Sequence, residues 1–305
     1  MNKRTTTVYI ASGFILAIVF LSAYFFIKKP ERVTSNRSEE VKKVLVFKDV
    51  KYSGEKKGVV DWELRAKLVR KYIDKSMVEL EGIDGEYKPK PGTTVLFKGS
   101  KGEMDTEKEV GWMNDVEVIY KDEYHIKSSS MNFDFKKSLA FTPAPVDVQG
   151  KRFTMVGVGL NADTKEQIIT VQKDVSGSVK GEKGNFKFSS DKFVYLLNDN
   201  MYIFEGRVAV KGERMDLFCD KVYVRSNEDT IEKIDAVGKV RIMSQGTIAK
   251  SERAVYYFKE ENVVLKEDPK ITKENVEMRG ETIVYNLATD KFSVEKPKMR
   301  IEQRR

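Results

Sequence analysis

The sequence predicts an all-β protein, an elongated stack of strand-turn-strand units preceded by one transmembrane helix. A pattern of about thirty residues recurs from Asp191 to the C-terminus, which is the period of stacked supersecondary units. Within each unit apolar residues recur at a spacing of two, the period of a β-strand. Residues 8–27 carry no charge, and no stretch after residue 30 sustains a helical apolar period.

The uncharged stretch, residues 8–27, would span about 30 Å as a helix, which is the thickness of a bilayer's hydrocarbon core. It is too long for a signal-peptide core, and Ser22-Ala23-Tyr24 is a poor cleavage site. We therefore expect an uncleaved anchor, with residues 1–7 in the cytoplasm and residues 28–43 as a polar linker. Basic residues flank both ends of the anchor, so the orientation rests on the short N-terminus before a long folded part, which favours export of that part.

The net charge of +8 is concentrated near the anchor. Residues 1–43 hold eight basic and three acidic residues, so the rest of the chain is nearly balanced. It has no basic cluster interleaved with aromatic residues, which argues against nucleic-acid binding. Cys219 is the single cysteine and His125 the single histidine, so neither an internal disulfide nor a zinc site made of Cys and His can form. We expect no cofactor and no metal.

The repeat has two parts. An acidic residue with apolar residues two and four places on opens each copy, at Asp191, Asp220, Glu252 and Glu281. A turn residue, a basic residue and an alternating apolar strand follow, at Gly206-Arg207, Gly238-Lys239, Pro269-Lys270 and Pro297-Lys298. One unit cannot bury its apolar face alone, so neighbouring units must stack around a continuous apolar interior. The basic residues could meet phosphates or could be solvated residues that discourage wrong strand pairing, and we favour the second.

The chain between residue 44 and the repeats also alternates. Trp62, Leu64, Ala66 and Leu68 are separated by charged residues, Val116 and Val118 flank Glu117, and Phe133 and Phe135 flank Asp134. Taking about 8 to 10 residues for a strand and its turn, the part after the linker would hold about 25 to 30 strands.

Two parts of the chain resemble known families. The anchor followed by Gly58–Ala66, Asp115–Val118, Ser129–Phe133, Pro145-Val146 and Gly157–Leu160 resembles the LptC family, the bitopic inner-membrane component of the lipopolysaccharide transport bridge. The repeats from about residue 182 on are similar to the OstA or LptA family, the periplasmic bridge component. We therefore expect an LptC-like β-jellyroll at residues 44–181 and an OstA/LptA-like β-jellyroll at residues 182–305. The chain is longer than the usual bitopic component, as a fusion or extended version would be.

The resemblance implies a jellyroll that is open along one side, whose apolar trough holds the acyl chains of lipid A. It implies an inner-membrane, single-pass protein with its C-terminal domain in the periplasm. The partners would be lipopolysaccharide, the inner-membrane ABC transporter subunits beside the anchor and the N-terminal β edge, and another periplasmic or outer-membrane bridge protein at the C-terminal β edge. Jellyrolls of these families join edge strand to edge strand, and the transporter supplies the energy, so the protein would not be an enzyme.

The alternating apolar residues are the candidates for lining such a trough. They are Trp62, Leu64, Val116, Val118, Phe133, Phe135, Phe193, Tyr195, Val208, Val210, Val240, Ile242, Tyr256 and Tyr285. For any one of them, ordinary core packing is the competing interpretation. Phe193–Leu197 and Ala254–Phe258 are apolar on both faces, so alternation alone does not assign the side that faces a ligand.

Two other functions stay open at this point. One is an anchored structural or adhesion β-solenoid with a dry interior and no ligand. The other, an anchored glycan hydrolase, has little support, because His125 has no Ser or Cys nucleophile motif nearby and the pair Asp115 and Glu117 lies in an abundant charged background.

Overall fold

A computed structural model describes residues 44–56, 59–90, 93–120, 124–134, 136–181, 184–227, 230–289 and 291–301. They form two compact units: residues 44–150 with Asp163–Lys165, and Lys151–Ala162 with the residues from Glu166 on. The described residues contain 21 strands and one short 3-10 helix, η1 (Leu197–Asp199). The predicted all-β class is thereby confirmed. The predicted anchor, residues 8–27, lies outside the described residues, and within them no helix has the length and apolarity needed to cross a membrane.

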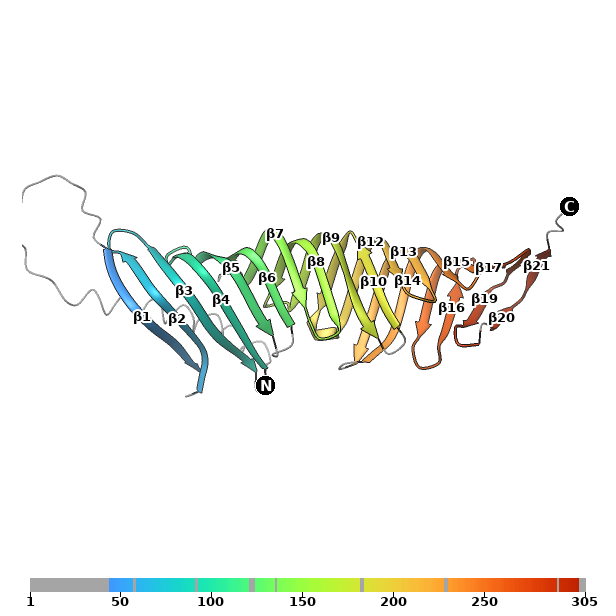
Figure 1. Ribbon diagram of the computed structural model, residues 1–305, viewed down its shortest axis with the longest axis horizontal. Coiled ribbons are helices and arrows are strands. Elements are labelled where there is room, and N and C mark those ends of the chain that lie inside the picture. Colours follow the sequence, from blue (N-terminus) through green and yellow to red (C-terminus); the bar gives the residue numbers. More distant parts are fainter. Residues whose placement is uncertain are drawn as a thin grey trace, which may run out of the picture. The chain divides into compact units, whose positions relative to one another are not determined.

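The first unit is an antiparallel meander in which each strand pairs with the next one in the chain, from β1 to β7 (Figure 1). Its strands are β1 (Val44–Lys56), β2 (Val59–Tyr72), β3 (Met77–Lys90), β4 (Thr93–Asp105), β5 (Val110–Tyr120), β6 (Tyr124–Asp134) and β7 (Leu139–Gln149). Strands of 11 to 14 residues are about twice the usual length.

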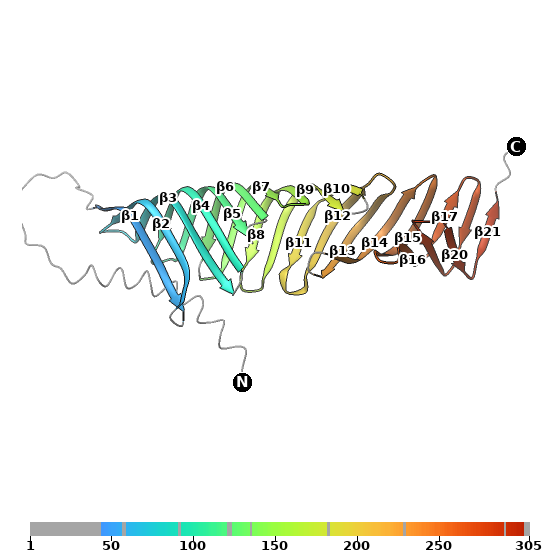
Figure 2. The ribbon, with the colours of Figure 1, turned by 60° about the horizontal axis from the view of Figure 1, so that its bottom comes forward.

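The second unit contains the remaining strands, also antiparallel in their pairings (Figure 2). They are β8 (Phe153–Asp163), β9 (Ile168–Gly181), β10 (Gly184–Ser190), β11 (Lys192–Leu196), β12 (Met201–Lys211), β13 (Asp216–Asn227), β14 (Thr230–Ser244), β15 (Thr247–Tyr257), β16 (Asn262–Lys266), β17 (Lys270–Lys273), β18 (Val276–Arg279), β19 (Thr282–Asn286), β20 (Lys291–Glu295) and β21 (Lys298–Ile301).

Long strands of the second unit bend in the middle, and each bent strand contributes to two half-sheets. The register shifts between Glu205 and Val208, between Phe218 and Lys221, and between Val237 and Val240, as a β-bulge requires. Half-sheet A comprises β11, residues 201–205 of β12, 221–225 of β13, 233–237 of β14, 253–257 of β15, and then β16, β19 and β20. Half-sheet B comprises β10, residues 208–211, 216–218, 240–243 and 247–250 of the same long strands, and then β17, β18 and β21.

The predicted repeat is wrong at two of its turns. Gly206-Arg207 and Gly238-Lys239 were expected to be turns between strands, but they lie inside β12 and β14, with φ of 76° and 45° in the first pair and 81° and 48° in the second. A bulge therefore bends a strand where a turn was predicted to end it. This is one reason why the described residues form 21 strands where about 25 to 30 were expected.

The alignment of the last two copies was wrong by two positions. The backbone N–H of Asp191 donates to Gly206 O, whereas the equivalent bonds run from Glu252 to Glu267 O and from Glu281 to Glu295 O. Arg207 and Lys239 are therefore matched by Asp268 and Lys296, which also have positive φ. Lys270 and Lys298 lie farther along half-sheet B.

Candidate functional site

The interior of the second unit is lined on half-sheet A by two parallel rows of side chains, one residue from each successive strand. The deep row, next to the bends, consists of Phe193, Phe204, Val222, Ala236, Ala254, Leu265, Ile283 and Val294. The margin row, two residues farther from the bends, consists of Tyr195, Tyr202, Val224, Ile234, Tyr256, Val263, Tyr285 and Phe292.

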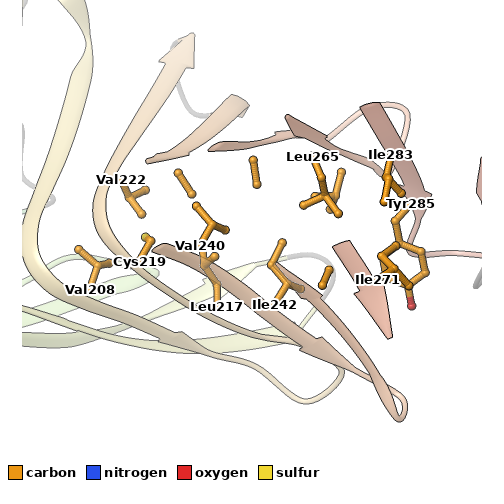
Figure 3. Close-up of a cluster of buried hydrophobic side chains, with 14 residues drawn as sticks. Val208, Leu217, Cys219, Val222, Val240, Ile242, Leu265, Ile271, Ile283 and Tyr285 are labelled. Carbon is orange, nitrogen blue, oxygen red and sulfur yellow. The ribbon is translucent and has the colours of Figure 1, made fainter. Parts of the chain in front are cut away.

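Half-sheet B faces these rows with one of its own. This B row consists of Phe188, Val210, Leu217, Ile242, Ala249, Ile271 and Met278. Figure 3 shows Leu265 and Ile283 on one side of the interior and Ile242 on the other, within a single cluster of buried apolar side chains. The two half-sheets are thus held together by apolar packing as well as by the bends.

Burial decreases from the bends toward the margin of half-sheet A on most of its strands, but not on β16 and β19, where Val263 is 2% and Tyr285 is 1% exposed. In the deep row Leu265 and Ile283 are 0% exposed and Ala236 is 2% exposed. Most of the margin row is partly exposed, including Tyr195, Val224 and Tyr256. The chain passes between the half-sheets at the bends, and the hairpin turn between β15 and β16 lies at the margin of half-sheet A. An apolar ligand would therefore meet the margin row first.

A chain of aromatic rings crosses the interior at the first strands of the second unit. Phe153 stacks on Phe188 with ring centroids 5.6 Å apart, and Phe188 meets Phe204 edge-on at 5.1 Å. Phe204 lies 5.2 Å from Phe193, and Tyr195 stacks on Tyr202 at 4.5 Å. Since Phe188 belongs to half-sheet B and Phe204 to half-sheet A, this contact joins the two faces.

A few polar groups are enclosed in the same interior. Ser251 is buried and donates a hydrogen bond from Oγ to Arg253 O, 2.9 Å away. Thr247 is 2% exposed, and its Oγ1 has no hydrogen-bond partner among the described residues. Burial raises the pKa of the Cys219 thiol to about 12, so this cysteine is a packed side chain rather than a nucleophile.

Ion pairs cover the outside of the bends. Arg207 donates from Nε to Asp191 Oδ1 at 2.8 Å, and Lys239 Nζ lies 3.6 Å from Asp220 Oδ2. Both basic side chains are more than four-fifths exposed, so each pair contributes little stability. Arg207 and Lys239 therefore each pair with the acidic residue across the same bend, and their role as guards against wrong strand pairing stays a prediction.

The first unit has the same construction. One row contains Leu64, Gly85, Phe97, Val118, Ile126 and Val148, and a second, more deeply buried row contains Ala66, Ile83, Gly99, Val116, Ser128 and Val146. A Cβ at Gly85 would come within 2.3 Å of Phe97 Cζ, so the glycine leaves the space that the ring fills. Positive φ at Gly82 and Asp115 marks two of the bends.

The predicted trough residues fall into four groups. Leu64, Val116 and Val118 lie in adjacent rows of the first unit, and Phe133 lies on the opposite side of the bend in β6, paired with Gly111 and Ala140. In the second unit Val208, Val210, Val240, Ile242, Tyr256 and Tyr285 belong to or pack against one cluster. Phe193 and Tyr195 lie in the aromatic chain. The side chain of Trp62 and all of Phe135 lie outside the part of the chain that the structure describes.

Sequence reasoning missed several interior residues, among them Phe188, Phe204, Leu217, Leu265 and Ile283. The signal was present for Phe204, which lies an even number of residues before Val208 on β12. It was absent on β13, where Cys219 and Val222 both point inward and the alternation reverses at the bulge.

Polar constellations outside the interior are surface features. His125 Nδ1 lies 3.3 Å from Glu117 Oε1, and Lys127 Nζ lies 3.5 Å from the same oxygen. These contacts lower the pKa of Glu117, His125 first. Across the described ranges no group of three or more His, Cys, Asp or Glu side chains is arranged to hold a metal ion.

Family models match both parts of the chain. Residues 14–180 match the model described as lipopolysaccharide-assembly, LptC-related, and residues 187–291 match the model described as LptA/(LptD N-terminal domain) LPS transport protein. No curated protein matches the chain. One similar solved structure is LptH from Pseudomonas aeruginosa, the LptA homologous periplasmic component of the lipopolysaccharide transport device. It has 17% identity and a TM-score of 0.38, over 41% of this chain and 99% of that one. Because the first model spans more than half of the residues, the chain belongs to the LptC-related lipopolysaccharide-assembly family.

Proposed function

We propose that this protein is a membrane-anchored, non-enzymatic carrier that accepts lipopolysaccharide from an inner-membrane ABC transporter and passes it toward the outer membrane. Membership in the lipopolysaccharide-assembly family supports the cargo. The observation that carries the proposal is the set of continuous apolar rows inside each unit, with burial that decreases toward the margin of half-sheet A. Acyl chains require an apolar path of this kind.

In this proposal residues 8–27 anchor the protein, residues 44–181 form an LptC-like open jellyroll, and residues 182–305 form an OstA/LptA-like one. The edge of β1, whose described pairing is with β2, would meet the transporter. The strands β20 and β21, whose described pairings are with β19 and β18 only, would meet another bridge protein by strand addition.

The fourteen predicted trough residues keep their proposed role as acyl-chain contacts. The graded burial suggests an order among them. Tyr195 and Tyr256 in the margin row would contact lipid first, while Ile242 in the B row would do so only when the half-sheets part.

An anchored structural β-solenoid is the second candidate. It is favoured by the complete burial of Leu265, Ile271 and Ile283, since side chains already fill the deep part of the interior. A solenoid core needs no ligand.

Photo-crosslinking in cells distinguishes the two candidates. A photoreactive amino acid would be placed at Tyr256, which faces inward in the margin row, and at Tyr257, which is the next residue, has the same native side chain and is 39% exposed on the outer face. The carrier predicts a lipopolysaccharide adduct at position 256 that requires an active transporter and is absent at position 257. A folded protein that forms no adduct at Tyr256, Tyr195 or Val118 would leave the solenoid as the function.

A further inference from the structure

The outer surface of half-sheet B carries a line of like charges, one on each of five neighbouring strands. This cationic row consists of Arg241, Lys250, Lys270, Arg279 and Lys298, which are register partners from β14 through β15, β17 and β18 to β21. At about 4.8 Å between strands the row is about 19 Å long.

The row faces away from the apolar interior. Its members alternate along their strands with the B-row residues Ile242, Ala249, Ile271 and Met278, all of which are buried. Side chains on a strand point to opposite faces in turn, so the cations point outward. Four of the five are exposed, and Lys270 is partly so.

Few carboxylates neutralise the row. Glu277 pairs with Lys270 and lies 3.0 Å from Arg279 Nε, and Arg241 lies over the Phe218 ring at 5.3 Å. Neither Lys250 nor Lys298 forms an ion pair with another described residue. Like charges directly opposite each other on neighbouring strands destabilise a sheet, so the fold itself gains nothing from this arrangement.

The charged residues on the outer face of half-sheet A are arranged differently. There Glu205 lies between two lysines, 3.4 Å from Lys192 Nζ and 2.6 Å from Lys221 Nζ, and Arg253 donates to Asp235 from Nε at 3.0 Å. Like-charged register partners also occur on half-sheet A, at Arg225 and Lys233 and at Arg253 and Lys266, but there they are isolated pairs. Among the described residues, a run of five like charges on neighbouring strands is found on half-sheet B and not on half-sheet A.

Among the residues of half-sheet B that the structure describes, only the cationic row carries one sign of charge without interruption over five strands. Two residues closer to the bends the corresponding positions are mostly acidic, with two lysines among them: Asp220, Lys239, Glu252, Asp268, Glu281 and Lys296. On the other side the neighbouring positions are mixed: Lys187, Lys211, Asp216, Met243, Ile248, Thr272, Glu277 and Arg300. A broad anionic surface such as a membrane would meet these carboxylates as well as the cations.

An extended acidic chain fits this geometry better than a membrane does. Side chains on one face of a strand recur about every 6.8 Å, so about three or four carboxylates would match the length of the row. We propose that the cationic row is a docking site for an extended acidic segment of a partner protein. Such a segment would place its carboxylates over the row and leave the flanking lines uncovered.

The test uses the full-length chain in a non-ionic detergent and a fluorescent peptide in which glutamate alternates with threonine over eight residues. Binding would be followed by fluorescence anisotropy at low and at physiological salt, because exposed ion pairs weaken as salt rises. The test variant is Arg241→Gln/Lys250→Gln/Lys298→Gln. The matched control is Arg225→Gln/Lys266→Gln/Lys291→Gln, which removes one arginine and two lysines that are exposed on half-sheet A.

We expect the test variant to bind the peptide about threefold to thirtyfold more weakly than the native chain, and the control to bind within about twofold of it. Equal loss in both variants would show that only net charge matters and would overturn the proposal. So would a native chain that does not bind the peptide. Displacement of the peptide by phosphatidylglycerol in mixed micelles, at equal negative charge, would assign the row to a membrane surface instead.

Discussion

Replacing Gly206 by alanine tests whether the bends hold the two half-sheets in place. Gly206 has φ of 76°, and an added Cβ would lie 2.3 Å from Asp191 Oδ2 and 2.8 Å from Asp191 Cβ. The carboxylate oxygen can move, but Cβ of Asp191 is fixed by the backbone N–H bond to Gly206 O. The strand must therefore shift, and the Arg207 pair with Asp191 is disturbed as well.

The size of the effect follows from two contributions. A left-handed φ costs alanine about 1 kcal/mol after allowance for the stiffer unfolded chain. The close contact adds about 1–3 kcal/mol, as overpacking usually does. We expect Gly206→Ala to lower the opening free energy of β12 and β13 by about 2–4 kcal/mol.

Gly246 provides the control, because its φ is 80° and a Cβ there would meet nothing within 4 Å. Gly246→Ala should cost about 1 kcal/mol, which is the backbone contribution without the contact. Amide hydrogen exchange with mass spectrometry on peptides from β12 and β13 measures both variants in the full-length chain. If Gly206→Ala weakens protection no more than Gly246→Ala does, the contact across the bend has no structural importance and the reasoning fails.

Three further predictions concern the core, the buried thiol and an acidic group. Leu265→Ala should destabilise the second unit by about 2–5 kcal/mol. Ile248→Ala, at a residue 39% exposed, should change stability by less than about 0.5 kcal/mol. Thermal unfolding followed by circular dichroism would compare the two variants. Cys219, with its pKa raised to about 12, should react with iodoacetamide at pH 8 at least about a thousandfold more slowly than the same thiol in urea, and equal rates would show that it is accessible. Lys270 and then Arg279 lower the pKa of Glu277. The stability that the ionised Glu277 side chain contributes is therefore present above the ordinary glutamate pKa and is lost as pH falls through the lower folded value. Exchange protection of β18 should decline over that acidic range in the native chain and not in Glu277→Gln.

The sequence was sufficient for the fold class because strand periodicity is local. The alternation at Val208 and Val210, at Val240 and Ile242, and at Val116 and Val118 identified side chains that the structure places inside. Each of these pairs lies entirely on one side of a bend. Within such a segment the spacing of two holds without interruption, so reading it from the sequence is safe.

The sequence did not reveal the bends. In β12 the inward positions run from Phe204 to Val208, an even step, but in β13 they run from Cys219 to Val222, which reverses the alternation. A bulge can fall on either of two paired strands, and only the pairing shows how many residues each contributes. A glycine followed by a basic residue was interpreted as a turn, because turns and bulges both use a positive φ.

In the proposed function the bends would also decide where an apolar ligand enters. They hold the deep row at almost complete burial, with Leu265 and Ile283 at 0% exposure, so parting the half-sheets there would expose the most apolar surface. The margin row at Tyr195 and Tyr256 is already partly open to solvent, and a ligand that covers it buries new apolar area without first breaking packed contacts. Acyl chains that follow the margin row would therefore load the protein while the deep row stays closed. In the proposed function, this order would let one interior serve both as a well-packed core and as a path for lipid.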